Sequence, residues 1–133
     1  MIVVDASALA AFVLKEEGWR RLAKYLAHAV SVDHVVKEAV NAIWRATYLR
    51  KLITVNEAYK AYTLLMSLIG RNILVEHELK YIEKALEISL SHGLSLYDSL
   101  YIALALEKSL PLLTLDALQR KVAKRIGIET KPS

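Results

Sequence analysis

Residues 1–9 read Met1-Ile2-Val3-Val4-Asp5-Ala6-Ser7-Ala8-Leu9, and this stretch decides the fold. The three residues before Asp5 are all apolar, which is typical of a strand buried on both faces of a parallel sheet. We expect a helix to follow it directly, from Ser7 to Lys15. Residues 112–115 repeat the apolar pattern and lead through Asp116 into another expected helix at 117–126. Two strands that each lead through an aspartate into a helix indicate an α/β fold.

The rest of the chain alternates between weaker strand candidates and helical patterns. Further strands are expected at 29–32, 73–75 and 128–130, and further helices at 19–26, 34–51, 56–69, 78–92 and 97–108. The helix at 97–108 is apolar nearly all round, so it should be buried at the centre. Together these elements predict a single α/β domain spanning residues 1–133, with a mostly parallel, five-stranded sheet and more helix than strand.

The composition excludes several classes of protein. The 133 residues contain no cysteine, which excludes disulfides and thiolate sites. No apolar run reaches the roughly 18 residues of a membrane helix, and no basic leader precedes the first strand, so we expect a cytoplasmic protein without membrane contact. The net charge of +4 favours a polyanionic partner, although basic clusters are also common on solvated helix faces.

Two carboxylates follow the expected buried strands. Asp5 and Asp116 each come directly after one of them. Ligands of open parallel sheets bind outside the carboxyl ends of the strands, so both residues are candidates for a binding site. An aspartate between a strand and a helix is also a common N-cap, and either residue taken alone fits that structural role.

Asp98 and Glu38 are the other candidate acids. Asp98 opens the apolar helix at 97–108, but with Ser95 it also matches a capping-box pattern. Glu38 lies within an apolar stripe of the helix at 34–51, with Asn41 one turn later. Acidic residues are rarely buried without a partner, so Glu38 is either paired, peripheral or functional.

The four acids taken together indicate a metal-dependent reaction. Carboxylates that converge on one sheet edge repel one another unless a cation lies between them, and hard oxygen ligands favour Mg²⁺ or Mn²⁺. Such an ion activates water, neutralises phosphate charge and stabilises the leaving oxygen in phosphodiester hydrolysis. The acids therefore indicate a nuclease.

Four segments resemble, in order, the motifs of PIN-domain nucleases, and in particular the VapC-type toxins of toxin–antitoxin pairs. They are Val3-Val4-Asp5-Ala6-Ser7-Ala8-Leu9, Glu38-x-x-Asn41, Tyr97-Asp98-Ser99-Leu100-Tyr101-Ile102-Ala103-Leu104-Ala105 and Leu113-Thr114-Leu115-Asp116. The resemblance covers nearly the whole chain. It implies a parallel sheet of strand order 3-2-1-4-5, with helices on both faces.

The resemblance also implies an activity and a set of roles. The protein would be a Mg²⁺- or Mn²⁺-dependent endoribonuclease that dimerises and is held inactive by a small antitoxin. Asp5 and Asp98 would hold the metal, Asp116 is the third expected ligand, and Glu38 would act through water. Ser7, Asn41 and Thr114 would support the site. Many relatives carry a further acid after the fourth motif, but here Ala117, Leu118 and Gln119 follow, so a second metal would bind weakly or only with substrate.

Other interpretations fit less well. Haloacid-dehalogenase-like enzymes carry a second aspartate where this chain has Ser7, and receiver domains carry an acidic pair where it has Val4 and Asp5. The four glycines form no phosphate loop, and the four histidines lack metal-ligand spacing, so we expect the histidines at the surface. The alternative of a different class is a PIN-like module that only contacts proteins.

Two surfaces remain open from the sequence. We expect Lys121, Lys124 and Arg125 to contact RNA. The helices at 34–51 and 56–69 carry four aromatic side chains, which fit either ordinary core or a contact with a second copy or an antitoxin. These are Trp44, Tyr48, Tyr59 and Tyr62.

Overall fold

The computed structural model describes residues 1–133 and contains one parallel five-stranded sheet. The strands are β1 (Ile2–Val4), β2 (Ala29–Val32), β3 (Ile73–Glu76), β4 (Leu112–Leu113) and β5 (Thr130–Lys131). Their order is β3-β2-β1-β4-β5, and every neighbouring pair is parallel. This is the predicted fold class and strand order.

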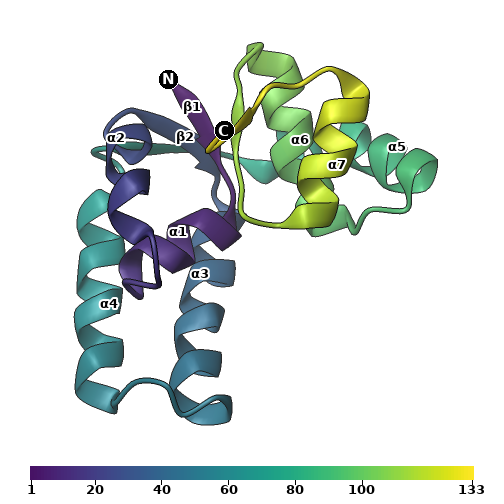
Figure 1. Ribbon diagram of the computed structural model, residues 1–133. Coiled ribbons are helices and arrows are strands. Elements are labelled where there is room, and N and C mark those ends of the chain that lie inside the picture. Colours follow the sequence, from purple (N-terminus) through teal and green to yellow (C-terminus); the bar gives the residue numbers. More distant parts are fainter.

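Seven α-helices connect the strands. They are α1 (Ala6–Val13), α2 (Ala23–Leu26), α3 (His34–Trp44), α4 (Val55–Leu68), α5 (Ile82–His92), α6 (Leu96–Lys108) and α7 (Ala117–Ile126). Short 3₁₀ segments occur at Trp19–Leu22 and Glu78–Lys80, and a π-helical turn at Arg45–Leu49 extends α3. In Figure 1, α1 to α4 lie to one side of the strands and α5 to α7 to the other, as expected.

The core is built around β1 at the centre of the sheet. Its three residues are buried, and so are the four residues of β2 and both residues of β4. Strands covered on both faces read as continuous apolar runs, which is why they are recognisable in the sequence. The carboxyl ends of β1 and β4 are adjacent, because Val4 pairs with Leu113. The residues that follow these two strands therefore lie side by side.

Helix α6 is the buried central helix that the sequence predicts. The Ser95 side chain caps it by accepting a hydrogen bond from the Asp98 amide at 3.2 Å. Seven consecutive residues, Ser99 to Ala105, are buried. A helix enclosed in this way holds its first turn, which carries Asp98, in a fixed position against the sheet.

The α3–α4 hairpin departs from the expected core packing. Trp44, Tyr48, Tyr59 and Tyr62 are 49%, 68%, 69% and 44% exposed. The interpretation of these side chains as ordinary core is therefore wrong. Helical spacing shows which residues share a face, but whether another element covers that face depends on the tertiary structure. In Figure 1 the far ends of α3 and α4 extend beyond the other helices.

Smaller differences concern the ends of elements. The last strand is Thr130–Lys131 rather than 128–130, because Gly127 adopts a left-handed conformation that ends α7 and the chain then turns. Strand β4 stops at Leu113, and Thr114 turns towards the end of β1.

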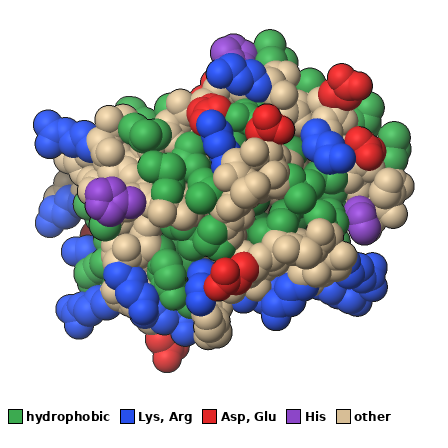
Figure 2. All heavy atoms as spheres, turned by 90° about the horizontal axis from the view of Figure 1, so that it is seen from above, with side chains coloured by type: hydrophobic (Ala, Val, Ile, Leu, Met, Phe, Trp, Pro, Cys, Tyr) green, Lys and Arg blue, Asp and Glu red, His purple; other side chains and the backbone are tan.

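None of the helices combines the length and apolar character needed to cross a bilayer. Figure 2 shows apolar side chains open at the centre of one face, with basic side chains gathered along an edge.

Candidate active site

A pocket of about 650 Å³ opens at the carboxyl edge of the sheet. Helix α1, helix α3 with its extension, the first turn of α6 and the two residues before α7 all contribute to its lining. The four predicted acids, Asp5, Glu38, Asp98 and Asp116, all belong to that lining. Acids that are up to 111 residues apart in sequence (116 − 5) therefore face one cavity.

Asp5 forms the floor of the pocket and is only 1% exposed. It is also the N-cap of α1, since its carboxylate accepts a hydrogen bond from the Ala8 amide at 2.9 Å. The Ser7 hydroxyl donates to it at 2.7 Å, and the Thr114 hydroxyl donates at 2.5 Å. The capping role and the position in the site are thus compatible, and Ser7 and Thr114 are the side chains that orient this acid.

The pKa of Asp5 is raised to about 6. Burial is the main cause, because a charged carboxylate loses its hydration inside the protein. The hydrogen bonds from Thr114, Ala8 and Ser7 lower the pKa but offset only part of this effect, and the nearby charge of Asp98 raises it further. A cation bound beside Asp5 would favour the charged form and reverse the shift.

Asp116 lies beside Asp5 through their shared neighbour Thr114. The Thr114 hydroxyl accepts a hydrogen bond from the Asp116 amide at 3.0 Å. One carboxylate oxygen of Asp116 caps α7 by accepting from the Gln119 amide at 2.7 Å. The other oxygen makes no hydrogen bond within the chain, so Asp116 combines a capping role with a free oxygen at the pocket.

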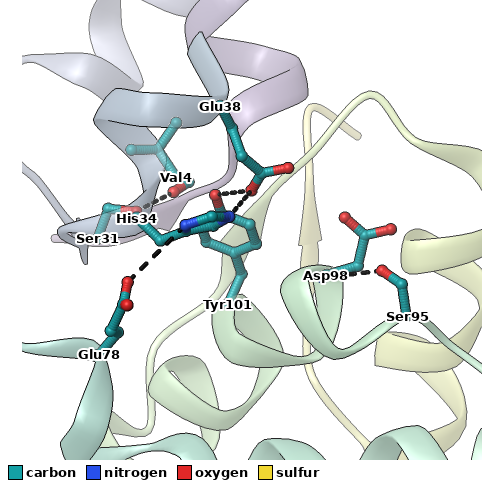
Figure 3. Close-up of polar contacts among 8 residues, drawn as sticks. All are labelled: Val4, Ser31, His34, Glu38, Glu78, Ser95, Asp98 and Tyr101. Atoms are coloured by element: carbon teal, nitrogen blue, oxygen red, sulfur yellow. Dashed lines mark hydrogen bonds and ion pairs between the residues drawn. The ribbon is translucent and has the colours of Figure 1, made fainter. Parts of the chain in front are cut away.

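Asp98 differs because its carboxylate has no capping role. Ser95 accepts from the Asp98 amide, but no reciprocal bond runs from the Asp98 carboxylate to Ser95, so the capping-box interpretation is only half correct. In Figure 3 this carboxylate points away from Ser95. Burial raises the pKa of Asp98, and the charges of Asp116 and Glu38 raise it further. The free energy of this repulsion would be recovered if a cation bound here.

Two side chains that were not predicted from the sequence lie against the Glu38 carboxylate, and one of them hydrogen-bonds to it. The Tyr101 hydroxyl donates a hydrogen bond to the Glu38 carboxylate, and His34 Nε2 lies 3.7 Å from the same carboxylate oxygen (Figure 3). Burial and the Glu38 charge both raise the pKa of Tyr101, so its hydroxyl stays a donor. Tyr101 follows Asp98 by three positions on α6, and this helical spacing was the available signal.

His34 corrects the expectation that the histidines lie at the surface. Its side chain is mostly buried, lies between Glu38 and Glu78, and stacks on Tyr97 with ring centroids 4.6 Å apart. His34 precedes Glu38 by four positions, so the two side chains meet on one face of α3. The hydrogen bond from Tyr101 fixes the direction in which Glu38 points, and His34 lies beside the same carboxylate without hydrogen-bonding to it.

Other predicted residues lie away from the pocket. Asn41 is exposed and does not belong to the pocket lining, because the face of α3 that carries Glu38 continues through Ala42. The predicted RNA contacts Lys121, Lys124 and Arg125 are exposed on α7, and none of them lines the pocket.

The acids fit a hydrated divalent ion. No group of three or more acidic or histidine side chains is close enough to hold an ion by itself. Mg²⁺ keeps several of its waters and is usually bound through one or two carboxylates together with substrate phosphate. The free carboxylate of Asp98, the free oxygen of Asp116 and the repulsion that raises the pKa of Asp98 match that mode of binding.

Comparison with known proteins agrees with this geometry. The family model described as PIN domain matches residues 2–125. Ribonuclease VapC3 of Pyrobaculum aerophilum is 30% identical over 134 residues, which cover 98% of this chain and 98% of that protein. The crystal structure of PAE2754 from Pyrobaculum aerophilum superposes with a TM-score of 0.69 at 23% identity, covering 97% of this chain and 87% of that one. VapC20 of Mycobacterium tuberculosis, a sarcin-ricin loop cleaving toxin, gives 0.67 at 22% identity, covering 96% of both chains.

Proposed function

The chain belongs to the PIN-domain family, and on that basis we propose that it is a Mg²⁺- or Mn²⁺-dependent endoribonuclease, the toxin of a toxin–antitoxin pair. The whole chain, residues 1–133, would act as one nuclease domain in the cytoplasm, where RNA is available. The observation that carries the proposal is the meeting of Asp5, Glu38, Asp98 and Asp116 in one pocket.

The residues of the chain would divide the work of hydrolysis. Asp5, Asp98 and Asp116 would hold the ion, with Ser7 and Thr114 fixing the orientation of Asp5. The ion, when bound, would supply an activated water and neutralise the charge of the phosphate. Hydrolysis breaks one P–O ester bond, the OH of the water bonds to phosphorus, and the proton of the water would pass by way of Glu38 and solvent to the leaving oxygen.

Glu38 would orient the attacking water and accept its proton. The Tyr101 hydroxyl and His34 approach the same carboxylate oxygen, and the second oxygen makes no hydrogen bond within the chain. That second oxygen is therefore available to a water in the pocket. A base that is already held in place loses little entropy when it meets the water, which favours the reaction.

The direct test is cleavage of structured RNA by the purified protein with Mg²⁺ or Mn²⁺, combined with calorimetric titration of each ion. We expect cleavage that EDTA abolishes and that Glu17→Gln, a change at an exposed acid outside the pocket, leaves intact. A protein that binds neither ion and cuts no RNA at any ion concentration would instead be a non-catalytic PIN-like module.

We also propose that the exposed α3–α4 hairpin contacts another protein chain. Trp44, Tyr48, Tyr59 and Tyr62 leave an apolar surface that water does not favour. A homodimer or the antitoxin would cover it. Light scattering at micromolar concentration distinguishes the two partners. A dimer of the protein alone favours the homodimer, whereas a monomer that forms a complex only when antitoxin is added favours the antitoxin.

A third proposal concerns the path of the RNA. The α7 basic face, defined as Lys121, Lys124 and Arg125, is exposed and makes no ion pair. Unpaired cations on one helix attract the phosphate backbone without reading its sequence. The α7 basic face would therefore guide RNA towards the pocket.

A further inference from the structure

Two arginines line the acidic pocket, and the proposed reaction gives them no role so far. Arg45 and Arg50 contribute to the same lining as the four acids. Both are exposed at the surface of the molecule, and neither makes an ion pair or a side-chain hydrogen bond within the chain. The only other charged residue in the lining is Glu16.

The π-turn explains why both arginines face the pocket. In an α-helix, residues five apart differ by roughly 140° around the axis, so they would point in different directions. Here the Arg50 amide donates to the Arg45 carbonyl at 2.8 Å, and this bond closes one wider turn across five residues. The turn brings Arg50 close to the angular position of Arg45. Single π-turns of this kind occur frequently at functional sites.

The arginines lie along the groove rather than among the acids. Arg45 follows Glu38 by seven positions, which is two helical turns on the same face and about 10 Å along the axis. Ala42 lies between them on that face and also lines the pocket. A small side chain at this place leaves the groove open between the acidic end and the arginine end.

We infer that Arg45 and Arg50 form a binding site for a phosphate of the RNA backbone next to the one that is cleaved. Guanidinium groups bind phosphate oxygens through paired hydrogen bonds, and these two have no competing partner in the chain. The site would hold the RNA in register, so that the scissile phosphate meets the acids. This inference rests on the proposed nuclease function, and it adds a second basic contact to the RNA path, at the pocket itself.

The test measures RNA binding against salt concentration in an Asp98→Asn background, which prevents cleavage. The probe is a short, single-stranded oligoribonucleotide that carries a fluorescein label. Its binding is measured by fluorescence anisotropy with Mg²⁺ present. Arg45→Gln with Arg50→Gln should lower the slope of log K against log salt by about 0.7, since the two arginines bind one phosphate and each phosphate contact on a single strand contributes about 0.7. Arg45→Lys with Arg50→Lys should restore most of the slope, because the charges return.

The matched control is Arg21→Gln with Arg71→Gln, which removes two exposed arginines that do not line the pocket. It should leave the slope unchanged. The inference is overturned if the double variant at Arg45 and Arg50 keeps the wild-type salt slope. It is also overturned if the control variant lowers the salt slope by the same amount.

Cleavage assays separate this inference from the proposed function. In a protein that keeps Asp98, the double variant Arg45→Gln with Arg50→Gln should lose more kcat/KM on an oligonucleotide than on a dinucleotide. The dinucleotide has no phosphate beside the one that is cleaved. An equal loss on both substrates would place the arginines at the scissile phosphate and overturn the neighbouring site. If the wild type cuts no RNA but the salt slope still depends on these arginines, the nuclease proposal fails and the phosphate site stands.

Discussion

Replacing Asp5 with asparagine should stabilise the metal-free protein at neutral pH. Burial raises the pKa of Asp5 from 3.8 to about 6, so the folded protein holds this proton more tightly than the unfolded chain does. Asparagine keeps the shape of the side chain and caps helices about as well as aspartate, so α1 should begin as before. The variant therefore removes the charge and retains most of the local structure.

The size and the sign of the effect follow from the pKa difference. Below about pH 4 the acid is protonated in both states and its charge has no cost. As the pH rises from about 4 to 6, the unfolded chain ionises first, and the folded state loses stability relative to it. Above about pH 6 the loss is complete and amounts to roughly 3 kcal/mol. The stability advantage of Asp5→Asn over the wild type should therefore grow by about 3 kcal/mol between pH 3 and pH 7.

The assay is urea unfolding followed by circular dichroism, in EDTA, at a series of pH values. The variant loses one acceptor for the Ser7 and Thr114 hydroxyls, which costs about 1 kcal/mol at every pH and cancels from the pH dependence. Glu17→Gln serves as the control and should run parallel to the wild type. If the curve of Asp5→Asn also runs parallel to the wild type, burial does not raise the pKa of Asp5 as described.

Three further predictions concern the other residues of the site. Asp98→Asn should abolish cleavage without lowering the unfolding midpoint in EDTA, because the Asp98 carboxylate caps no helix. A clear loss of stability would mean that this carboxylate does cap α6. Tyr101→Phe removes the hydrogen-bond donor to Glu38 but keeps the ring. It should lower the rate of single-turnover cleavage by about tenfold or more, since a hydrogen bond to a charged group contributes roughly 1.5–3 kcal/mol. An unchanged rate would show that Tyr101 does not position Glu38. Replacing the α7 basic face with glutamine should weaken RNA binding and lower its salt slope by about 2, and an unchanged slope would show that RNA does not use that helix.

The fold could be predicted because its signals are local. The apolar run before Asp5 and the run before Asp116 mark the two buried strands, and Gly93 and Gly127 mark the ends of α5 and α7. The π-turn after α3 could not be predicted, because Arg45–Leu49 contains neither proline nor glycine to interrupt the helical pattern. The turn is visible only in the hydrogen bond from Arg50 to Arg45.

The acids of the site could be found in the sequence, but their surroundings could not. Asp5 and Asp116 follow strands, so their positions at the sheet edge follow from the topology. The spacing of Tyr101 from Asp98 places both on one face of α6, but the contact of Tyr101 with Glu38, 63 positions away, depends on the tertiary structure. Trp44 and its aromatic neighbours show the same limit, since their spacing is that of a buried face while their side chains are exposed.

The double role of Asp5 has a consequence for how the protein opens. Its carboxylate is bonded to the first turn of α1 through Ala8 and to the end of β4 through Thr114, at the centre of the sheet. Asp5 directly follows β1, which pairs with β2 and β4, so we expect this part of the site to open only when the central strands separate. The Ala8 amide should therefore exchange its hydrogen with solvent only through global unfolding. Such a pocket stays assembled whenever the protein is folded, and its activity can be stopped by filling it but not by loosening it locally.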